Sequence, residues 1–177
     1  YLRQDIIWHK PNPMPESVRD RCTKAHEYIF MLSKSPSHYF DWQAMQEPVA
    51  ASTVARLAQP TLADQAGSDR VPGKTNGPMK AVGNSETRNR RSVWTVTTKP
   101  FKEAHFATFP PDLIEPCVLA GCPEGGTVLD PFFGAGTTGV VCQKHNRNCV
   151  GIELNPAYFD IAAKRLGIDE PVMQAAE

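Results

Sequence analysis

The chain has 177 residues and no net charge, with 19 Lys and Arg residues against 19 Asp and Glu residues. This is the length of one ordinary globular domain, and a hydrophobic content of 41% excludes a largely disordered protein. No apolar run approaches the roughly 18 residues of a membrane span, and no signal-peptide pattern is present. A balanced charge also argues against a nucleic-acid-binding protein.

The zero net charge, however, is a cancellation between segments. Residues 1–69 carry 7 basic and 8 acidic side chains, residues 70–102 carry 8 basic and one acidic, and residues 103–177 carry 4 basic and 10 acidic. The basic middle segment therefore predicts a footprint for phosphates, which reverses the first conclusion. A solvated loop without a ligand is the alternative for this segment.

The cysteines indicate neither a disulfide framework nor a zinc site. There are five of them, an odd number, and no Cys-x-x-Cys pair occurs. We expect reduced thiols, a cytoplasmic protein and no metal. The chain opens with Tyr1 in an apolar stretch, so we expect a truncated or partial chain.

Two strands are predicted in the first part of the chain, over residues 1–8 and His26 to Leu32. The loop between them contains three prolines at alternate positions, which exclude helix, and further on Arg19 and Arg21. Residues 43–92 are rich in small and polar side chains. Within them, Gly67 to Asn89 is predicted to be loop or disorder.

From Val93 onwards, strands and helices alternate. The predicted elements are a helix from Pro110 to about Ala120, a strand over 127–130, a helix from Thr137 to about His145 and a strand over 148–153. Asn155 caps a last helix, Pro156 takes its first position and Gly167 ends it. This order is typical of an α/β fold with a parallel, Rossmann-like sheet.

The strongest chemical signal is the turn Asp-Pro-Phe-Phe-Gly-Ala-Gly-Thr-Thr-Gly at residues 130–139. Glycines between a strand and a helix let a ligand approach the backbone closely. Glu153 ends the next predicted strand, where a carboxylate can accept hydrogen bonds from both ribose hydroxyls of a nucleoside. Together these features predict a nucleoside cofactor across the strand ends.

Two cofactors fit the glycines. Gly134, Gly136 and Gly139 satisfy the G-x-G-x-x-G pattern of dinucleotide binding. Asp130 at the strand end favours S-adenosylmethionine instead, because an acid can bind a cationic amino acid moiety, which a pyrophosphate lacks. A purely structural turn is the third alternative.

These motifs resemble those of the β-class amino-methyltransferases of DNA, which methylate the exocyclic nitrogen of cytosine (N4) or adenine (N6). Residues 130–139 look like the cofactor motif of that family, and residues 150–155 (Val-Gly-Ile-Glu-Leu-Asn) like its ribose-binding motif. Residues 105–110 (His-Phe-Ala-Thr-Phe-Pro) look like the segment that precedes the cofactor motif in this permuted class. Residues 5–12 and 21–30 fit the family's middle strands.

The resemblance implies a Rossmann-like methyltransferase sheet with helices on both faces and a circularly permuted motif order. It implies catalytic-side strands over residues 1–42, a target-recognition region over 43–92 and a cofactor-binding part over 93–177. The cofactor would be S-adenosylmethionine and the partner double-stranded DNA, in a restriction–modification or phage enzyme. A homodimer or a missing amino-terminal part is a further expectation.

The resemblance also assigns roles to single residues. Asp130 would bind the methionine amino group, Glu153 the ribose, and Gly134 and Gly136 would let the cofactor approach the backbone. Thr137 and Thr138 would serve the methionine carboxylate at the helix start.

Other cofactor assignments have a structural alternative. Phe132 would form an apolar wall of the pocket, or it is a core residue. His105, Phe106 and Thr108 would contact the methionine end, or His105 is a hydrogen-bonded structural histidine. DNA contacts are expected from basic side chains: Arg19, Arg21, Arg88, Arg90 and Arg91. Exposed arginines that merely solubilise the surface are the alternative.

One family motif is missing from the sequence. The catalytic motif is Asp, Asn or Ser followed by Pro-Pro and an aromatic residue, whereas the chain's Pro110-Pro111 pair lies between Phe109 and Asp112. The permuted order puts the motif upstream of Tyr1. The alternatives to a complete enzyme are a catalytically incomplete fragment or split-enzyme part and, from the glycine pattern alone, a nicotinamide-dependent oxidoreductase. The phrase at residues 10–17 leans towards cytosine N4.

Overall fold

A computed structural model describes residues 1–59, 86–101 and 108–168. Contacts divide the chain into two compact units, one of residues 45–90 and one of residues 1–44 with 91–177. The first of these falls inside the 43–92 segment that the sequence sets apart. No helix in the described ranges is long and apolar enough to cross a membrane.

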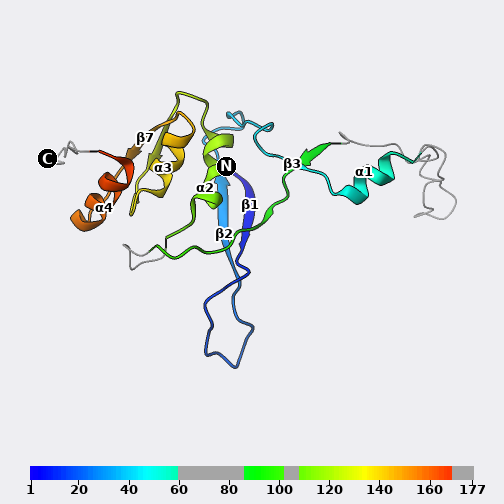
Figure 1. The fold of residues 1–177 in the computed structure, drawn as a ribbon, viewed down its shortest axis with the longest axis horizontal. Coiled ribbons are helices and arrows are strands. Elements are labelled where there is room, and N and C mark those ends of the chain that lie inside the picture. Colours follow the sequence, from blue (N-terminus) through cyan, green and yellow to red (C-terminus); the bar gives the residue numbers. More distant parts are fainter. Residues whose placement is uncertain (60–85, 102–107, 169–177) are drawn as a thin grey trace. The chain divides into compact units, whose positions relative to one another are not determined.

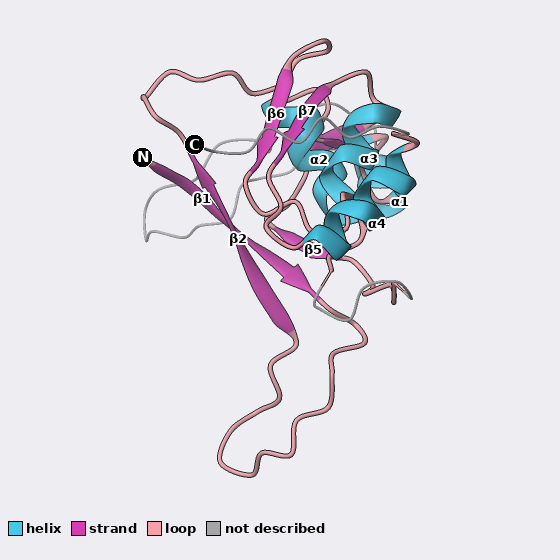
Figure 2. Ribbon diagram, turned by 90° about the vertical axis from the view of Figure 1, so that its left-hand side faces the viewer, coloured by secondary structure: helices cyan, strands magenta, loops and turns pink. Residues whose placement is uncertain are grey.

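A three-stranded sheet lies in the larger unit, in the order β2-β1-β5. Strand β1 (Leu2–His9) pairs antiparallel with β2 (His26–Leu32) and parallel with β5 (Val93–Thr95). One face of this sheet is buried, with Ile6, Trp8 and Trp94 in the core. The proline-bearing loop between β1 and β2 extends beyond the strand ends (Figures 1 and 2).

The carboxyl-terminal part alternates helices and strands as predicted (Figure 1). The elements in chain order are α2 (Pro111–Gly121), β6 (Thr127–Asp130), α3 (Thr137–Lys144), β7 (Asn148–Gly151) and α4 (Pro156–Leu166). Strands β6 and β7 pair in parallel with Thr127 opposite Asn148. Val118 of α2 and Val141 and Cys142 of α3 form the core cluster that joins the two helices.

The ends of α4 follow from its sequence. The Asn155 side chain accepts a hydrogen bond from the Ala157 amide at 3.0 Å, and Pro156 occupies the first turn. Gly167 ends the helix in the left-handed conformation, with φ of 68°. The N-cap, the first residue and the C-cap are those that the sequence predicts.

The smaller unit contains three elements that the sequence did not predict. They are β3 (Gln46–Pro48), α1 (Ala51–Leu57) and β4 (Thr87–Asn89), with β3 and β4 paired antiparallel. The prediction of loop over Gly67 to Asn89 is wrong for β4, because pairing with β3 orders those three residues. Residues 60–85 lie outside the described ranges.

Candidate functional site

The glycine turn joins β6 to α3, and Asp130 organises it. The Oδ1 atom of Asp130 accepts a hydrogen bond from the Phe132 amide at 3.0 Å, and Oδ2 accepts one from the Thr138 hydroxyl at 2.6 Å. A carboxylate offers about four acceptor positions, so both oxygens retain capacity for a cationic ligand. Asp130 is thus fixed in orientation at the carboxyl end of β6.

Glu153 lies two residues beyond β7 and reaches the same turn. Its Oε2 atom accepts a hydrogen bond from the Gly134 amide at 2.7 Å, and its Oε1 atom accepts one from the Asn155 amide at 2.9 Å. The backbone continues the strand pairing here, because the Ile152 amide donates to the Asp130 carbonyl at 2.9 Å. Two carboxylates therefore stand at the adjacent ends of two parallel strands, where α/β sheets bind ligands.

The two turn glycines have different surroundings. Both have positive φ, 52° at Gly134 and 74° at Gly136. A Cβ atom on Gly134 would meet nothing closer than the Phe132 carbonyl oxygen at 4.0 Å, whereas one on Gly136 would lie 3.0 Å from the Ala162 Cβ atom. Open space at Gly134 suits close approach of a ligand, while Gly136 is needed for the packing of the turn against α4.

The two neighbouring phenylalanines also differ. Phe132 is 88% exposed, so the alternative that it is a core residue is wrong. Phe133 instead lies against the glycines, since a Cβ atom on Gly139 or Gly151 would come within 2.7 Å or 2.4 Å of its ring. Sequence reasoning missed Phe133, although a glycine at Gly151 inside a strand was a signal of close packing.

Buried polar groups fix the start of α3. Thr137 and Thr138 are both buried, and Thr138 donates to Asp130 as described. Arg165 of α4 donates to the Ala135 carbonyl at 3.0 Å and to the Thr137 hydroxyl at 3.1 Å. Arg165 was not predicted from the sequence, and its contacts tie α4 to the glycine turn.

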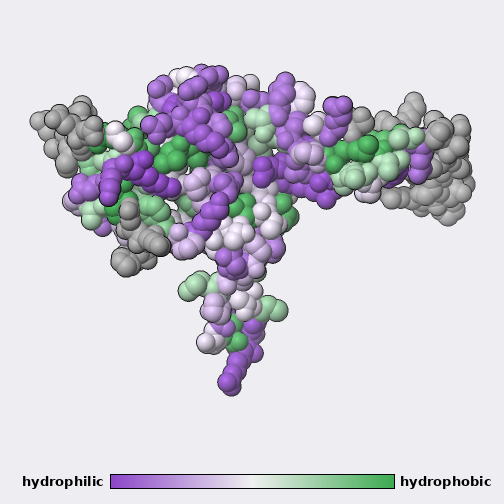
Figure 3. Space-filling model, in the orientation of Figure 1, coloured by the Kyte–Doolittle hydropathy of each residue, from purple (hydrophilic) through white to green (hydrophobic). Residues whose placement is uncertain are grey.

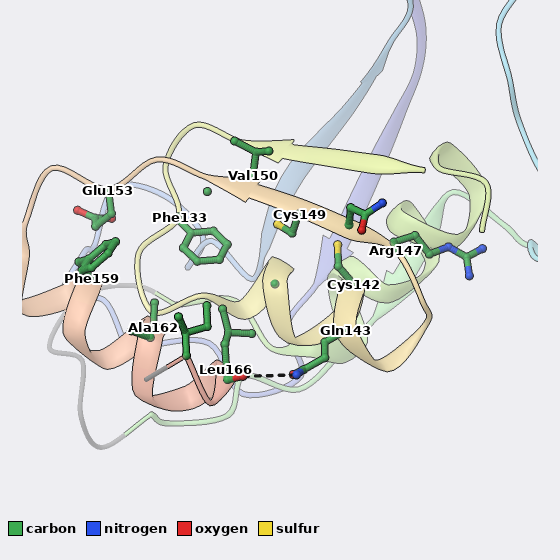
Figure 4. A pocket seen from close by; sticks show the side chains of 15 residues that line it. Phe133, Cys142, Gln143, Arg147, Cys149, Val150, Glu153, Phe159, Ala162 and Leu166 are labelled. Carbon is green, nitrogen blue, oxygen red and sulfur yellow. Dashed lines mark hydrogen bonds between the residues drawn. The ribbon is translucent and has the colours of Figure 1, made fainter. Parts of the chain in front are cut away.

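Each carboxylate lines a cavity. Glu153 borders a cavity of about 570 Å³ between β7, α3 and α4, into which the Phe133 ring points (Figure 4). Apolar atoms reach the surface in that part of the molecule (Figure 3). Asp130, Phe132 and Thr138 line a second cavity of about 540 Å³ together with Phe109 and residues of α2. Each cavity is thus lined by one of the two acids and by two phenylalanines, which are Phe133 and Phe159 in the first cavity and Phe109 and Phe132 in the second.

The thiols in the first cavity are not nucleophiles. Cys142 and Cys149 face each other from α3 and β7 (Figure 4). Burial raises the pKa of the Cys149 thiol to about 12, and it also raises the pKa of Cys142. Both thiols are therefore protonated at neutral pH.

The predicted methionine-end residues are described in part. Thr108 is half-buried just before α2, and its neighbour Phe109 lines the second cavity. His105 and Phe106 lie outside the described residues.

The five predicted DNA-binding arginines lie in three places. Arg19 and Arg21 are exposed on the loop between β1 and β2, where Arg21 pairs with Asp20 at 2.9 Å. Arg88 of β4 pairs with Glu47 of β3 at 2.9 Å, and Arg90 follows in the same unit. Arg91 is exposed in the larger unit. The structure thus gives Arg88 and Arg21 intramolecular partners.

Comparison with known proteins identifies the family. A family model described as DNA methylase, covering N6 and N4 methyltransferases, matches residues 1–164. The chain belongs to this DNA methylase family. It is 50% identical over 177 residues to the Type II methyltransferase M.Cfr9I of Citrobacter freundii, covering 99% of this chain and 48% of that protein. It is 46% identical to the Type II methyltransferase M.SmaI of Serratia marcescens, covering 94% of this chain and 46% of that protein.

Solved structures agree on the methylase fold. The cytosine-N4-specific PvuII DNA methyltransferase matches with a TM-score of 0.63 at 18% identity, covering 93% of this chain and 51% of that one. The complex of M1.HpyAVI with S-adenosylmethionine matches with a TM-score of 0.57 at 23% identity, covering 93% of this chain and 62% of that one. The chain spans about half the length of the curated relatives it matches.

Proposed function

We propose that this methylase chain forms the cofactor-binding and DNA-contacting part of a site-specific DNA amino-methyltransferase. Its cofactor is S-adenosylmethionine, and its target is the exocyclic amino group of cytosine (N4) or adenine (N6) in duplex DNA. The observation that carries the proposal is the pair Asp130 and Glu153, which stand at adjacent strand ends around the open backbone of Gly134.

The residues present fit this cofactor. Asp130 retains acceptor capacity for an ammonium group and borders a cavity with the exposed ring of Phe132. Glu153 borders the other cavity and retains acceptors for two hydroxyls. When bound, the cofactor supplies an electrophilic methyl group on a sulfonium. The chain's own contribution is to hold that group in place, because positioning of two reactants supplies much of the rate.

Other residues support the same site. The amides at the start of α3 suit a carboxylate, and the buried Thr137 and Thr138 fix that helix start rather than lying open to a ligand. We assign the methionine end to Thr108 with His105 and Phe106, as the resemblance implies, and Phe109 extends the aromatic lining there.

We assign the DNA contacts to basic side chains, several of which are exposed. Arg19 and Arg21 occupy a loop that extends from the sheet, and Arg91 is exposed beside the 45–90 unit in sequence. We assign these residues, with Arg88 and Arg90, to phosphates or base edges of duplex DNA. The target base must leave the stack before its amine can react. Residues 43–92 are the candidate target-recognition region.

A second candidate is a part that binds cofactor and DNA but does not transfer the methyl group alone. The absence from the sequence of an Asp, Asn or Ser before Pro-Pro and an aromatic favours it. An exocyclic amine is a poor nucleophile because its lone pair is delocalised into the ring. That missing acceptor would be needed to orient the amine.

Calorimetric titration with S-adenosylmethionine and with NAD tests the cofactor. We expect S-adenosylmethionine to bind and NAD not to bind. Binding of NAD alone would make the chain a nicotinamide-dependent protein and end the proposal.

Incubation with labelled S-adenosylmethionine and duplex DNA, followed by mass spectrometry of the nucleosides, separates the two candidates. N4-methylcytosine or N6-methyladenine identifies an active enzyme and its acceptor base. Cofactor binding without either product identifies the incomplete part.

A further inference from the structure

Arg165 on α4 contacts two other parts of the chain at once. Its Nη1 atom donates to the Ala135 carbonyl in the glycine turn at 3.0 Å, and to the hydroxyl of Thr137, the first residue of α3, at 3.1 Å. Its guanidinium also lies over the ring of Phe101, with the Cζ atom 4.7 Å from the ring centroid. Phe101 belongs to the stretch between β5 and α2. One side chain therefore links the glycine turn, helix α4 and that stretch.

The hydrogen bond to Ala135 reaches the middle of the turn. Ala135 stands between Gly134 and Gly136, whose backbones both have positive φ. It is also buried, and a buried carbonyl costs free energy unless it accepts a hydrogen bond. Arg165 supplies that bond, while Glu153 accepts one from the Gly134 amide at 2.7 Å. Two side chains from beyond the turn thus hold its backbone at two points, and of the two only Glu153 is a proposed ligand.

These contacts suit a guanidinium better than any other cation. A guanidinium is planar and carries several N–H donors, so its face can lie on an aromatic ring while its edge donates to oxygen atoms. The ammonium of a lysine has no such face. A cation beside the amino end of α3 also opposes the dipole of that helix, so the charge of Arg165 does not stabilise α3. Its hydrogen bonds instead stabilise the conformation of the turn.

We propose that Arg165 is a positioning residue for the cofactor. It holds the Ala135 carbonyl so that the turn keeps the conformation in which S-adenosylmethionine approaches the backbone at Gly134. This inference rests on the proposed function, because it concerns the same ligand. Arg165 acts through the turn rather than by touching the cofactor, since a loop that is already held in its binding conformation loses less freedom when the ligand binds.

Calorimetric titration of the 177-residue chain with S-adenosylmethionine tests the inference. Arg165→Met removes the donors but keeps a long side chain against Phe101. We expect it to raise the Kd about tenfold, as the loss of hydrogen bonds to a charged group would. Arg165→Lys keeps the charge without the planar group, so its Kd should fall between those of the wild type and Arg165→Met. Lys164→Met is the matched control, because Lys164 is an exposed cation of the same helix, and it should bind like the wild type.

Two further measurements separate positioning of the turn from a general loss of stability. Ile6→Val shortens a buried side chain in β1, so it should lower the melting temperature and leave the Kd unchanged. In heteronuclear NMR spectra recorded without cofactor, Arg165→Met should shift the amide signals of Gly134 and Gly136, and Ile6→Val should not. All titrations are made at a temperature at which melting curves show each variant to be folded.

The results that would overturn the inference are distinct from those that end the proposed function. A wild-type Kd in folded Arg165→Met overturns the inference alone, and so does an equal loss of affinity in Ile6→Val. If Arg165→Met does not fold, Arg165→Lys decides, and a wild-type Kd for that variant overturns the inference. Failure of the wild type itself to bind S-adenosylmethionine ends the proposed function, and this inference with it.

Discussion

Gly134 and Gly136 both have a positive φ, but only Gly136 packs closely against other residues. This difference in packing should appear in the stability of alanine variants. Replacing either by Ala places a Cβ atom in a conformation that costs roughly 1–2 kcal/mol. Gly136→Ala also brings that atom to 3.0 Å from Ala162, while Gly134→Ala meets open space. We expect Gly136→Ala to unfold at the lower temperature in thermal melts.

The same pair separates stability from cofactor binding. Gly134→Ala should weaken binding of S-adenosylmethionine more than it lowers the melting temperature, because the added methyl group stands where the ligand approaches. Equal melting temperatures for the two variants would contradict the packing role of Gly136.

The cysteines provide a second prediction at the residue scale. Cys22 is exposed, whereas burial raises the pKa of Cys149 to about 12. A thiol reacts as the thiolate, so Cys149 stays protonated and unreactive up to pH values well above neutrality. Alkylation with iodoacetamide followed by peptide mass spectrometry should label Cys22 first. Equally fast labelling of Cys149 would show that its cavity is open and polar.

The sequence predicts a site residue when the residue acts within its own motif, and it does not when the residue contacts a distant part of the chain. Asp130 and Gly134 lie in one contiguous motif and Glu153 in another, so the sequence predicted the two acids at the strand ends and the glycine in the turn between strand and helix. Phe133 and Arg165 act on residues 18 and 30 positions away in the chain, at Gly151 and Ala135. No short pattern records such contacts, so the sequence did not reveal them.

At the element scale, Glu115 joins α2 to α3. Its carboxylate accepts hydrogen bonds from Lys144 at 2.6 Å and from His145 at 2.5 Å. The Lys144 and then the His145 hydrogen bond hold the pKa of Glu115 below its ordinary value of 4.5. A lowered carboxyl pKa stabilises the fold above the ordinary value, and this stabilisation is lost as the pH falls through the lowered one.

The matching variant is Glu115→Gln. At about pH 7 it should destabilise the protein by up to about 1 kcal/mol, the upper size of an ion pair near the surface, since Lys144 is exposed while Glu115 and His145 are half-buried. The difference from the wild type should shrink as the pH falls below 4.5. Denaturant titrations at about pH 7 and at a pH below 4.5 measure this difference in the free energy of unfolding, with Glu124→Gln as the control variant. A difference that grows with acid would refute the role of the carboxylate.

The helices differ in how visible they were in the sequence. Helix α4 has Asn, Pro and Gly at its ends, each with a conformational preference of its own, so its limits could be predicted. Helix α1 has seven residues, no side-chain cap and no buried residue, so neither caps nor an apolar stripe mark it. Strands β3 and β4 are three residues each and exist through their mutual pairing.

At the scale of the whole molecule, strand pairing was the least predictable feature. The pairing of β1 with β5 joins Trp8 to Trp94, which are far apart in the chain. Parallel order within the carboxyl-terminal part was predictable because β6 and β7 are joined by one helix. The charge division was also visible, and it places the acidic excess in the part of the chain that holds Asp130 and Glu153.

The proposed cofactor site requires Glu153 as a ligand of S-adenosylmethionine, and one titration tests this directly. Calorimetry should compare binding of S-adenosylmethionine to the wild type, to Glu153→Gln and to Glu124→Gln, with melting curves to confirm folding. We predict that Glu153→Gln weakens binding about tenfold or more, the loss expected for hydrogen bonds to a charged group. Glu124→Gln should bind like the wild type. Unchanged affinity in folded Glu153→Gln would contradict the account.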